Sequence, residues 1–161
     1  INILYIYIYM NTLSNFDLED ICNDMDLPLR GIYFKDTVPP NPDRGFYIIN
    51  LQSEADPRNG THWTCFYYDG LTNLYYDSFG FPAPEELEEV IFPYIYNDRD
   101  IQDIKSSSCG YYCIAFIKFL KDLKNKKDAF QRAQEEAKEK AAKEQEILKQ
   151  VQGATGSVSG G

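Results

Sequence analysis

Cys109 lies where a thiol could serve as a nucleophile. It follows three serines and precedes Gly110 in the stretch SSSCGYYC, residues 106–113, at the predicted start of an apolar helix. The backbone N–H groups and the positive dipole end of a helix start favour thiolate over thiol. Gly110 has no side chain to crowd an approaching substrate. Because free cysteines are also common as small buried residues, this motif alone leaves core packing open.

His62, in the stretch GTHW, is the only histidine of the chain and the one candidate for a histidine base. The pair Asp69-Gly70 is preferred in two-residue type I′ turns, and such a turn pairs His62 with Asp77 across a hairpin. Opposed residues share a face of the sheet, so the carboxylate would orient the imidazole. A longer loop would slide the partner by two or three residues. Taken singly, a structural histidine and an aspartate bonding its own turn stay open.

Two further residues complete the candidate site. Gln102 precedes Cys109 by seven positions. Its side-chain amide and the Cys109 backbone N–H could together stabilise a carbonyl oxygen that gains negative charge. Trp63 follows His62 and is expected either to wall a substrate groove or to pack in the core.

The elements that must position these residues predict an α+β fold. Ser14 and Asp17 resemble a capping box and predict a helix over about 15–25, with Cys22 in the core. Aromatic and β-branched residues predict strands over 31–36 and 46–52, ahead of the hairpin.

Two helices are predicted after the hairpin. Residues 82–95 predict a short surface helix with Pro84 at its first helical position. From Ser108 the pattern predicts a central helix with a buried start. Composition divides the chain into four segments. Residues 1–9 are an N-terminal extension of uncertain origin, and residues 10–127 are the expected catalytic domain. Residues 128–152 are a charged helical extension without a sustained heptad, and residues 153–161 are a flexible Gly/Ser tail.

Composition also limits the partners. The chain has 161 residues and a formal net charge of −9, and residues 1–127 contain 11 Lys and Arg against 19 Asp and Glu. Such an acidic domain argues against nonspecific binding to the phosphate backbone of nucleic acid. Four cysteines, no visible signal peptide and no CxxC spacing favour a reducing compartment over disulfides or zinc. Residues 1–9 are about half the length needed to cross a bilayer, so no membrane partner is expected.

The order His62-Trp63, Asp77, Gln102 and Cys109-Gly110 resembles the adenain family of cysteine proteases, the adenovirus maturation endopeptidase and its virophage and Maverick/Polinton relatives. The resemblance covers residues 14–122 and rests on GTHW, YYDSFG and the spacing in QDIKSSSCGYYC. It implies a mixed sheet packed against the helix that bears the nucleophile. It also implies His62 as general base, Asp77 as its partner, Gln102 in the oxyanion hole and Cys109 as nucleophile. Adenain itself has glutamate at the acid position, while related SUMO-specific proteases have aspartate.

The resemblance implies a cysteine endopeptidase that processes capsid precursor proteins during virion maturation, in the virion and the infected cell, without a bound cofactor. Residues 78–101 contain no cysteine to which an activating peptide could be disulfide-bonded, and the acidic charge argues against DNA activation. Trp63 and Gly110 are the expected substrate-binding residues. The alternatives are a protease that removes a ubiquitin-like modifier, and an inactive partner-binding module that docks through 128–152.

Overall fold

The computed structural model describes residues 12–56, 62–100 and 107–155. The chain divides into two compact units, residues 1–121 and 122–161. The boundary between them falls inside the last helix, six residues before the end of the domain expected from composition. The expected N-terminal extension at 1–9, residues 156–161 of the expected tail and Gln102 lie outside the described residues.

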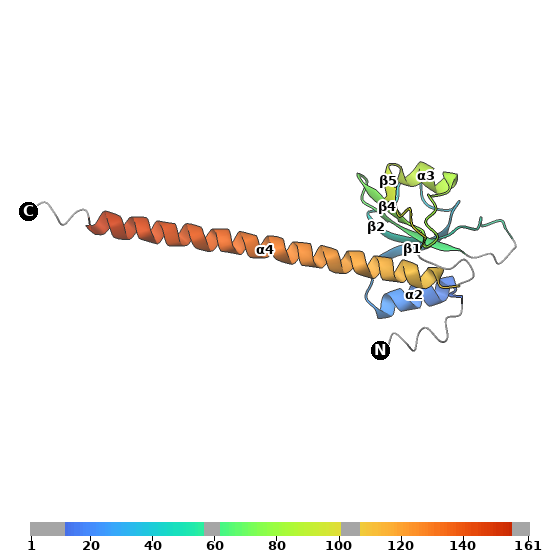
Figure 1. Cartoon of the computed structure of the whole chain (residues 1–161), viewed down its shortest axis with the longest axis horizontal. Coiled ribbons are helices and arrows are strands. Elements are labelled where there is room, and N and C mark those ends of the chain that lie inside the picture. Colours follow the sequence, from blue (N-terminus) through green and yellow to red (C-terminus); the bar gives the residue numbers. More distant parts are fainter. Residues whose placement is uncertain (1–11, 57–61, 101–106, 156–161) are drawn as a thin grey trace, which may run out of the picture. The chain divides into compact units, whose positions relative to one another are not determined.

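The first unit contains a mixed five-stranded sheet, which confirms the predicted α+β class (Figure 1). The strands follow one another across the sheet in chain order: β1 (Leu29–Phe34), β2 (Gly45–Asn50), β3 (Trp63–Tyr68), β4 (Asn73–Tyr76) and β5 (Tyr94–Tyr96). The two outer pairings are parallel and the two inner ones antiparallel. The helices are α2 (Asn15–Asp24), α3 (Glu85–Ile91) and α4 (Cys109–Thr155).

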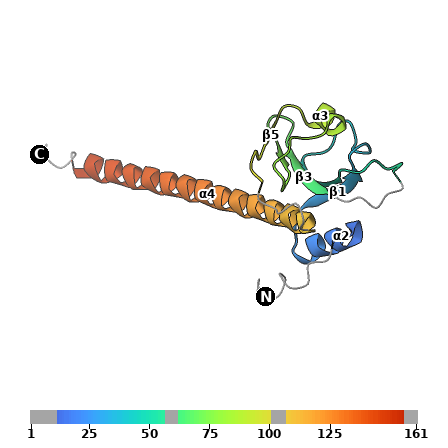
Figure 2. The same ribbon diagram turned by 45° about the vertical axis from the view of Figure 1, so that its right-hand side comes forward.

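Helices cover both faces of this sheet (Figures 1 and 2). Alternate residues of a strand point to opposite faces, so Ile48 and Ile49 of β2 enter different clusters. One cluster joins the sheet to α2 and the first turns of α4, through Leu18, Cys22, Phe46, Ile48, Trp63, Cys65, Cys109, Cys113 and Ile117. The other joins the sheet to α3, through Tyr47, Ile49, Phe66, Tyr75, Leu87 and Ile91.

The capping box predicted at the start of α2 is confirmed. Oγ of Ser14 accepts a hydrogen bond from the Asp17 N–H at 3.1 Å, and the Asp17 carboxylate accepts one from the Ser14 N–H at 2.8 Å. Both contacts satisfy N–H groups that a helix start leaves without an intrahelical partner. Cys22 is 1% exposed, as expected of a core residue.

The two-residue turn predicted at Asp69-Gly70 is wrong. Phe66 pairs with Tyr75 and Tyr67 with Leu74, so the loop has four residues and the register differs by two. Two side chains favour the longer loop. Asp69 accepts hydrogen bonds from the N–H groups of residues 71 and 72, and Asn73 accepts them from those of residues 69 and 70.

The helix predicted over 82–95 is too long. Its helical part is α3 alone, and residues 94–96 form the edge strand β5 instead. Pro93 explains the early end, because proline lacks the N–H that a continuing helix needs. Pro84 is the N-cap of α3 rather than its first helical residue.

The helix predicted from Ser108 begins at Cys109 and continues to Thr155, three residues into the segment expected to be a tail. None of the helices in the described part of the chain combines the length and apolar character that crossing a bilayer requires.

Candidate active site

His62 and Asp77 meet at one end of the hairpin. His62 immediately precedes β3, and Asp77 immediately follows β4. Nε2 of His62 lies 2.7 Å from Oδ1 of Asp77, whose side chain is 1% exposed. The predicted contact is therefore present although the predicted register is wrong. A slip of two residues keeps every side chain on its original face, which preserves the neighbourhood of the two groups.

Hydrogen bonds hold both the carboxylate and the backbone of Asp77. Its Oδ1 also accepts a hydrogen bond from the N–H of Phe79 at 2.8 Å. The side chain of Asn97 accepts a bond from the Asp77 N–H at 2.9 Å and donates one to the Asp77 carbonyl at 2.5 Å. Asn97 directly follows β5. Its side-chain amide therefore extends the contact between β4 and β5 by one residue. The backbone of the acid is thereby fixed to the sheet.

Phe79 is a site residue that the sequence reasoning missed. Its ring stacks on the imidazole of His62, with centroids 4.4 Å apart and planes inclined by 21°. In the observed register, residue 79 is the position that would oppose residue 62. Assuming a four-residue loop would have predicted Phe79 as the neighbour of His62. The Asp69-Gly70 pair instead favoured a two-residue loop. The stack limits rotation of the imidazole while Asp77 fixes its edge.

Cys109 is the first residue of α4 and is 3% exposed. Its Sγ accepts a hydrogen bond from the backbone N–H of Trp63 at 3.4 Å. The Cys109 thiol and the side chain of His62 also interact, and each shifts the pKa of the other. The structure thus brings together three of the four residues expected to carry the chemistry.

These contacts favour charge on both members of the Cys–His pair. Burial alone would raise the pKa of the Cys109 thiol, but hydrogen bonds from His62, the Trp63 N–H and the Gly110 N–H lower it below its ordinary value. Burial alone would lower the pKa of His62, but hydrogen bonds with Asp77 and Cys109 raise it to about 9. A thiolate beside an imidazolium is the state that these shifts favour.

Two of the other cysteines differ from Cys109 in the direction of their pKa shift. Cys22, Cys65 and Cys113 are buried, and all four thiols of the chain are free. Burial raises the pKa of Cys22 and that of Cys113, so both are held as neutral thiols. Within the described ranges, no group of three or more His, Cys, Asp or Glu side chains has the arrangement of a metal site.

Gly110 and Trp63 both have roles in packing. A Cβ on Gly110 would lie 3.2 Å from side-chain atoms of Leu13 and Leu18, so glycine lets α2 and its leading residues approach α4. The substrate-facing role expected for Gly110 stays a prediction. Trp63 is 4% exposed, and its indole N–H donates to the Leu13 carbonyl at 2.9 Å.

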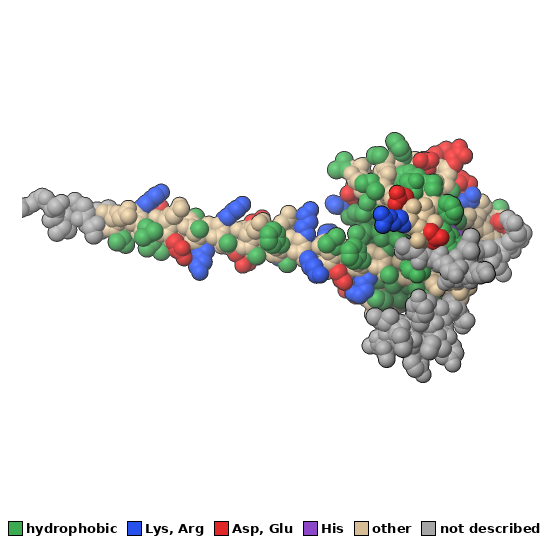
Figure 3. Space-filling model, viewed as in Figure 1, with side chains coloured by type: hydrophobic (Ala, Val, Ile, Leu, Met, Phe, Trp, Pro, Cys, Tyr) green, Lys and Arg blue, Asp and Glu red, His purple; other side chains and the backbone are tan. Residues whose placement is uncertain are grey.

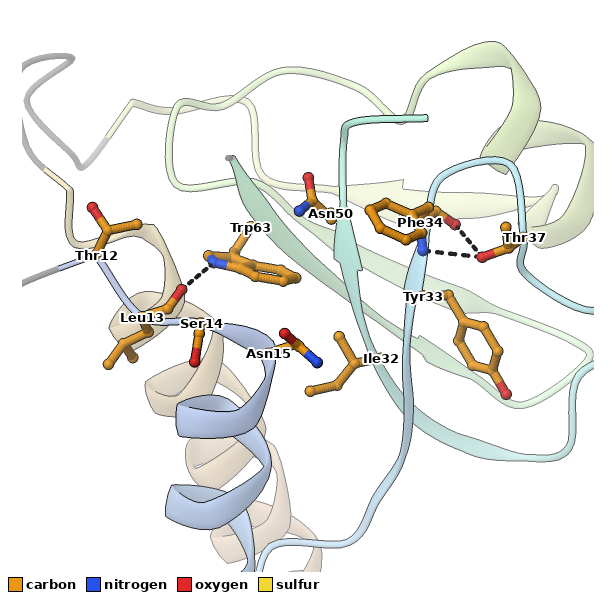
Figure 4. Close-up of a pocket in the computed structure, with 10 residues that line it drawn as sticks. All are labelled: Thr12, Leu13, Ser14, Asn15, Ile32, Tyr33, Phe34, Thr37, Asn50 and Trp63. Carbon is orange, nitrogen blue, oxygen red and sulfur yellow. Dashed lines mark hydrogen bonds between the residues drawn. The ribbon is translucent and has the colours of Figure 1, made fainter. Parts of the chain in front are cut away.

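Trp63 also forms one wall of a groove of about 590 Å³, next to the backbone N–H that contacts Cys109 (Figure 4). The groove lies between the start of α2, the strands β1 and β2, and the indole. It is lined by Thr12, Leu13, Ser14, Asn15, Ile32, Tyr33, Phe34, Thr37, Asn50 and Trp63. None of these described lining residues is charged, although the chain as a whole is acidic. Trp63 therefore packs in the core and also lines this groove, and its expected contact with substrate stays a prediction.

Gln102, the expected fourth member of the site, lies outside the described residues, and its role stays a prediction. No family model matches the chain, and the search of curated proteins gives no match either.

Proposed function

We propose that the chain is a cysteine endopeptidase in which Cys109, His62 and Asp77 form the catalytic triad. The observation that carries this proposal is the position of His62, which is hydrogen-bonded to a buried carboxylate and interacts with a thiol at a helix start. A nucleophile, a base and a group that orients the base are the three parts that thiol acyl transfer requires.

In the proposed mechanism, the Cys109 thiolate attacks the carbonyl carbon of a peptide bond and forms a tetrahedral oxyanion. The Cys109 backbone N–H and the Gln102 amide stabilise this oxygen. Collapse breaks the C–N bond, and the His62 imidazolium gives its proton to the departing amine. Water, deprotonated by His62, then attacks the thioester, which releases the acid and restores the thiolate. Asp77 holds the imidazole in place throughout.

The groove beside Trp63 supports a peptide as substrate. It lies beside the outer strand β1 and is lined by apolar, hydroxyl and amide side chains, which suit an uncharged segment. Trp63 connects the groove to the thiol, because its indole lines the groove and its backbone N–H touches Sγ of Cys109.

The biological substrate is proposed from the family resemblance alone. On that basis the enzyme cleaves capsid precursor proteins during virion maturation. A protease for a ubiquitin-like modifier would use the same triad, so the two readings differ only in the protein that is cut.

The test is a cleavage assay with the full chain and a panel of capsid precursors and ubiquitin-like fusions, with new N-termini identified by mass spectrometry. We expect cleavage of the precursors that Cys109→Ala abolishes. Cys113→Ala is the matched control, because it removes another buried thiol one helical turn away, and we expect it to retain activity. Cleavage of the fusions alone would favour the modifier protease. Cleavage that survives Cys109→Ala, or none by the native chain, would overturn the proposed mechanism.

A further inference from the structure

Asn50 presents an unused hydrogen-bond donor to the groove beside Trp63. It is the last residue of β2, lines the groove and is 7% exposed. Its Oδ1 accepts a hydrogen bond from the N–H of Gln52 at 3.0 Å, which identifies the other end of the amide as the donor Nδ2. Nδ2 has no partner among the described residues. It is not sealed from solvent either, in contrast to the hydroxyls of Thr64 and Tyr75.

Other polar groups of the groove already have partners within the protein. Oγ1 of Thr37 accepts a hydrogen bond from the Phe34 N–H and donates one to the Phe34 carbonyl. Oγ of Ser14 belongs to the capping box with Asp17. Asn50 is different, because a side chain so enclosed usually has its donors satisfied. Water can meet such a donor in the free protein, but a molecule that displaces this water must bring an acceptor of its own.

The strand pairing places this donor near the nucleophile. Asn50 lies directly opposite Trp63 in the β2–β3 ladder. The next residue, Leu51, donates its N–H to the carbonyl of His62 at 3.0 Å, so the Asn50–Trp63 pair is of the non-hydrogen-bonded type, in which facing side chains lie closest. Figure 4 shows the Asn50 side chain beside the indole of Trp63. The backbone N–H of Trp63 in turn donates to Sγ of Cys109.

A main-chain carbonyl is the acceptor that suits this donor best. The described lining of the groove carries no charged side chain, whereas acidic side chains gather over α3, on the opposite face of the sheet (Figure 3). A neutral amide without a cation beside it does not offset the water that a carboxylate would lose on entering the groove. Every residue of a peptide offers a carbonyl, whatever its side chain.

We infer that Nδ2 of Asn50 donates a hydrogen bond to a main-chain carbonyl oxygen of the peptide bound in the groove. This bond sets the position of the peptide along the groove relative to Cys109. The inference rests on the proposed function, because it requires Cys109 to be the nucleophile that the bound peptide meets.

The test compares two reagents that alkylate Cys109 by the same chemistry. Acetyl-Ala-Ala-Gly chloromethyl ketone is the peptide probe, and its side chains carry no hydrogen-bond acceptor. Chloroacetone has the same reactive group without the peptide. In both, the thiolate displaces chloride and forms a C–S bond. The ratio of their second-order rate constants therefore reports binding of the peptide and cancels any change in the thiol itself.

Two substitutions remove the donor in different ways. Asn50→Asp keeps the size of the side chain and the oxygen that Gln52 contacts, whereas Asn50→Leu removes the polar groups without adding charge. In the full chain, we expect both to lower the rate ratio by about tenfold, because the peptide carbonyl loses its partner. The loss should appear as a higher concentration for half-saturation by the probe, with the limiting rate retained. Asn23→Asp, the same exchange at an exposed residue of α2, is the matched control and should leave the ratio unchanged.

The outcomes separate this inference from the proposed function. If chloroacetone labels Cys109 no faster than Cys22, the proposed function fails and the inference fails with it. If Cys109 is selectively labelled but the rate ratio is the same in the native chain, Asn50→Asp and Asn50→Leu, the inference alone is overturned. The same conclusion follows if the peptide probe gives the native chain no advantage over chloroacetone. Urea denaturation checks that each variant is folded.

Discussion

Nε2 of His62 lies 2.7 Å from Oδ1 of Asp77, and this carboxylate is 1% exposed. A buried anion at hydrogen-bond distance stabilises the imidazolium, and the Cys109 contact adds to this effect. The pKa of the only histidine therefore reports on the integrity of the whole site.

We expect the single imidazole signal in an NMR titration to give His62 a pKa of about 9. Asp77→Asn keeps the shape but removes the charge, so burial should then pull the pKa of His62 towards or below its ordinary 6.5. Because the folded-state pKa is raised, this interaction stabilises the fold fully below pH 6.5, and its contribution is lost as the pH rises through about 9. An unchanged titration in Asp77→Asn would contradict the assigned contact.

The reactivity of Cys109 should extend to a lower pH than that of an ordinary thiol. Its pKa is lowered from 9.0, so alkylation by iodoacetamide at about pH 6 should be faster than that of an ordinary thiol. Cys22 and Cys113, whose pKa values are raised, serve as internal controls and should label slowly. In His62→Ala, burial should dominate and move the reactivity of Cys109 to alkaline pH. Peptide mass spectrometry resolves the four sites, and uniform labelling of the native chain would contradict this prediction.

Phe79 should act as a positioning residue for His62. Phe79→Leu removes the stacked ring, and we expect the alkylation rate of Cys109 at about pH 6 to fall about two- to tenfold, which matches the usual energy of an aromatic pair. Phe79→Tyr should preserve the rate. Phe81→Leu, at a nearby ring that is 61% exposed, should have no effect. An equal loss in Phe79→Leu and Phe81→Leu would show that the stack does not matter.

Gly80 should tolerate a side chain less well than Gly70. Both have left-handed backbone conformations, with φ of 76° and 84°, so alanine costs about 1–2 kcal/mol at each. At Gly80 the added Cβ would also lie 2.7 Å from the backbone of Arg99, whereas at Gly70 it would meet nothing within 4 Å. We expect Gly80→Ala to lower the free energy of unfolding by more than Gly70→Ala, as measured by urea denaturation. Equal losses would mean that Arg99 moves aside without cost.

Local rules were sufficient to predict several parts of the molecule. The capping box needs only the spacing of Ser14 and Asp17, because both its hydrogen bonds close within one helical turn. The helix start at Cys109 is similarly a property of the adjoining sequence. Even the meeting of His62 and Asp77 was foreseeable despite the wrong loop length, since side chains alternate with a period of two and the error was two residues.

What the tertiary structure decided depends on residues that are distant in the chain. The N–H of Trp63 reaches Cys109 across 46 positions, and Asn97 holds Asp77 across 20. No periodic sequence pattern predicts either contact, because each depends on how distant parts of the chain pack together. The same holds for the groove at Trp63, whose walls come from four separate segments. The sequence by itself therefore determined which chemical groups are present and on which faces they lie, while packing of the sheet against the helices decided their distances and charge states.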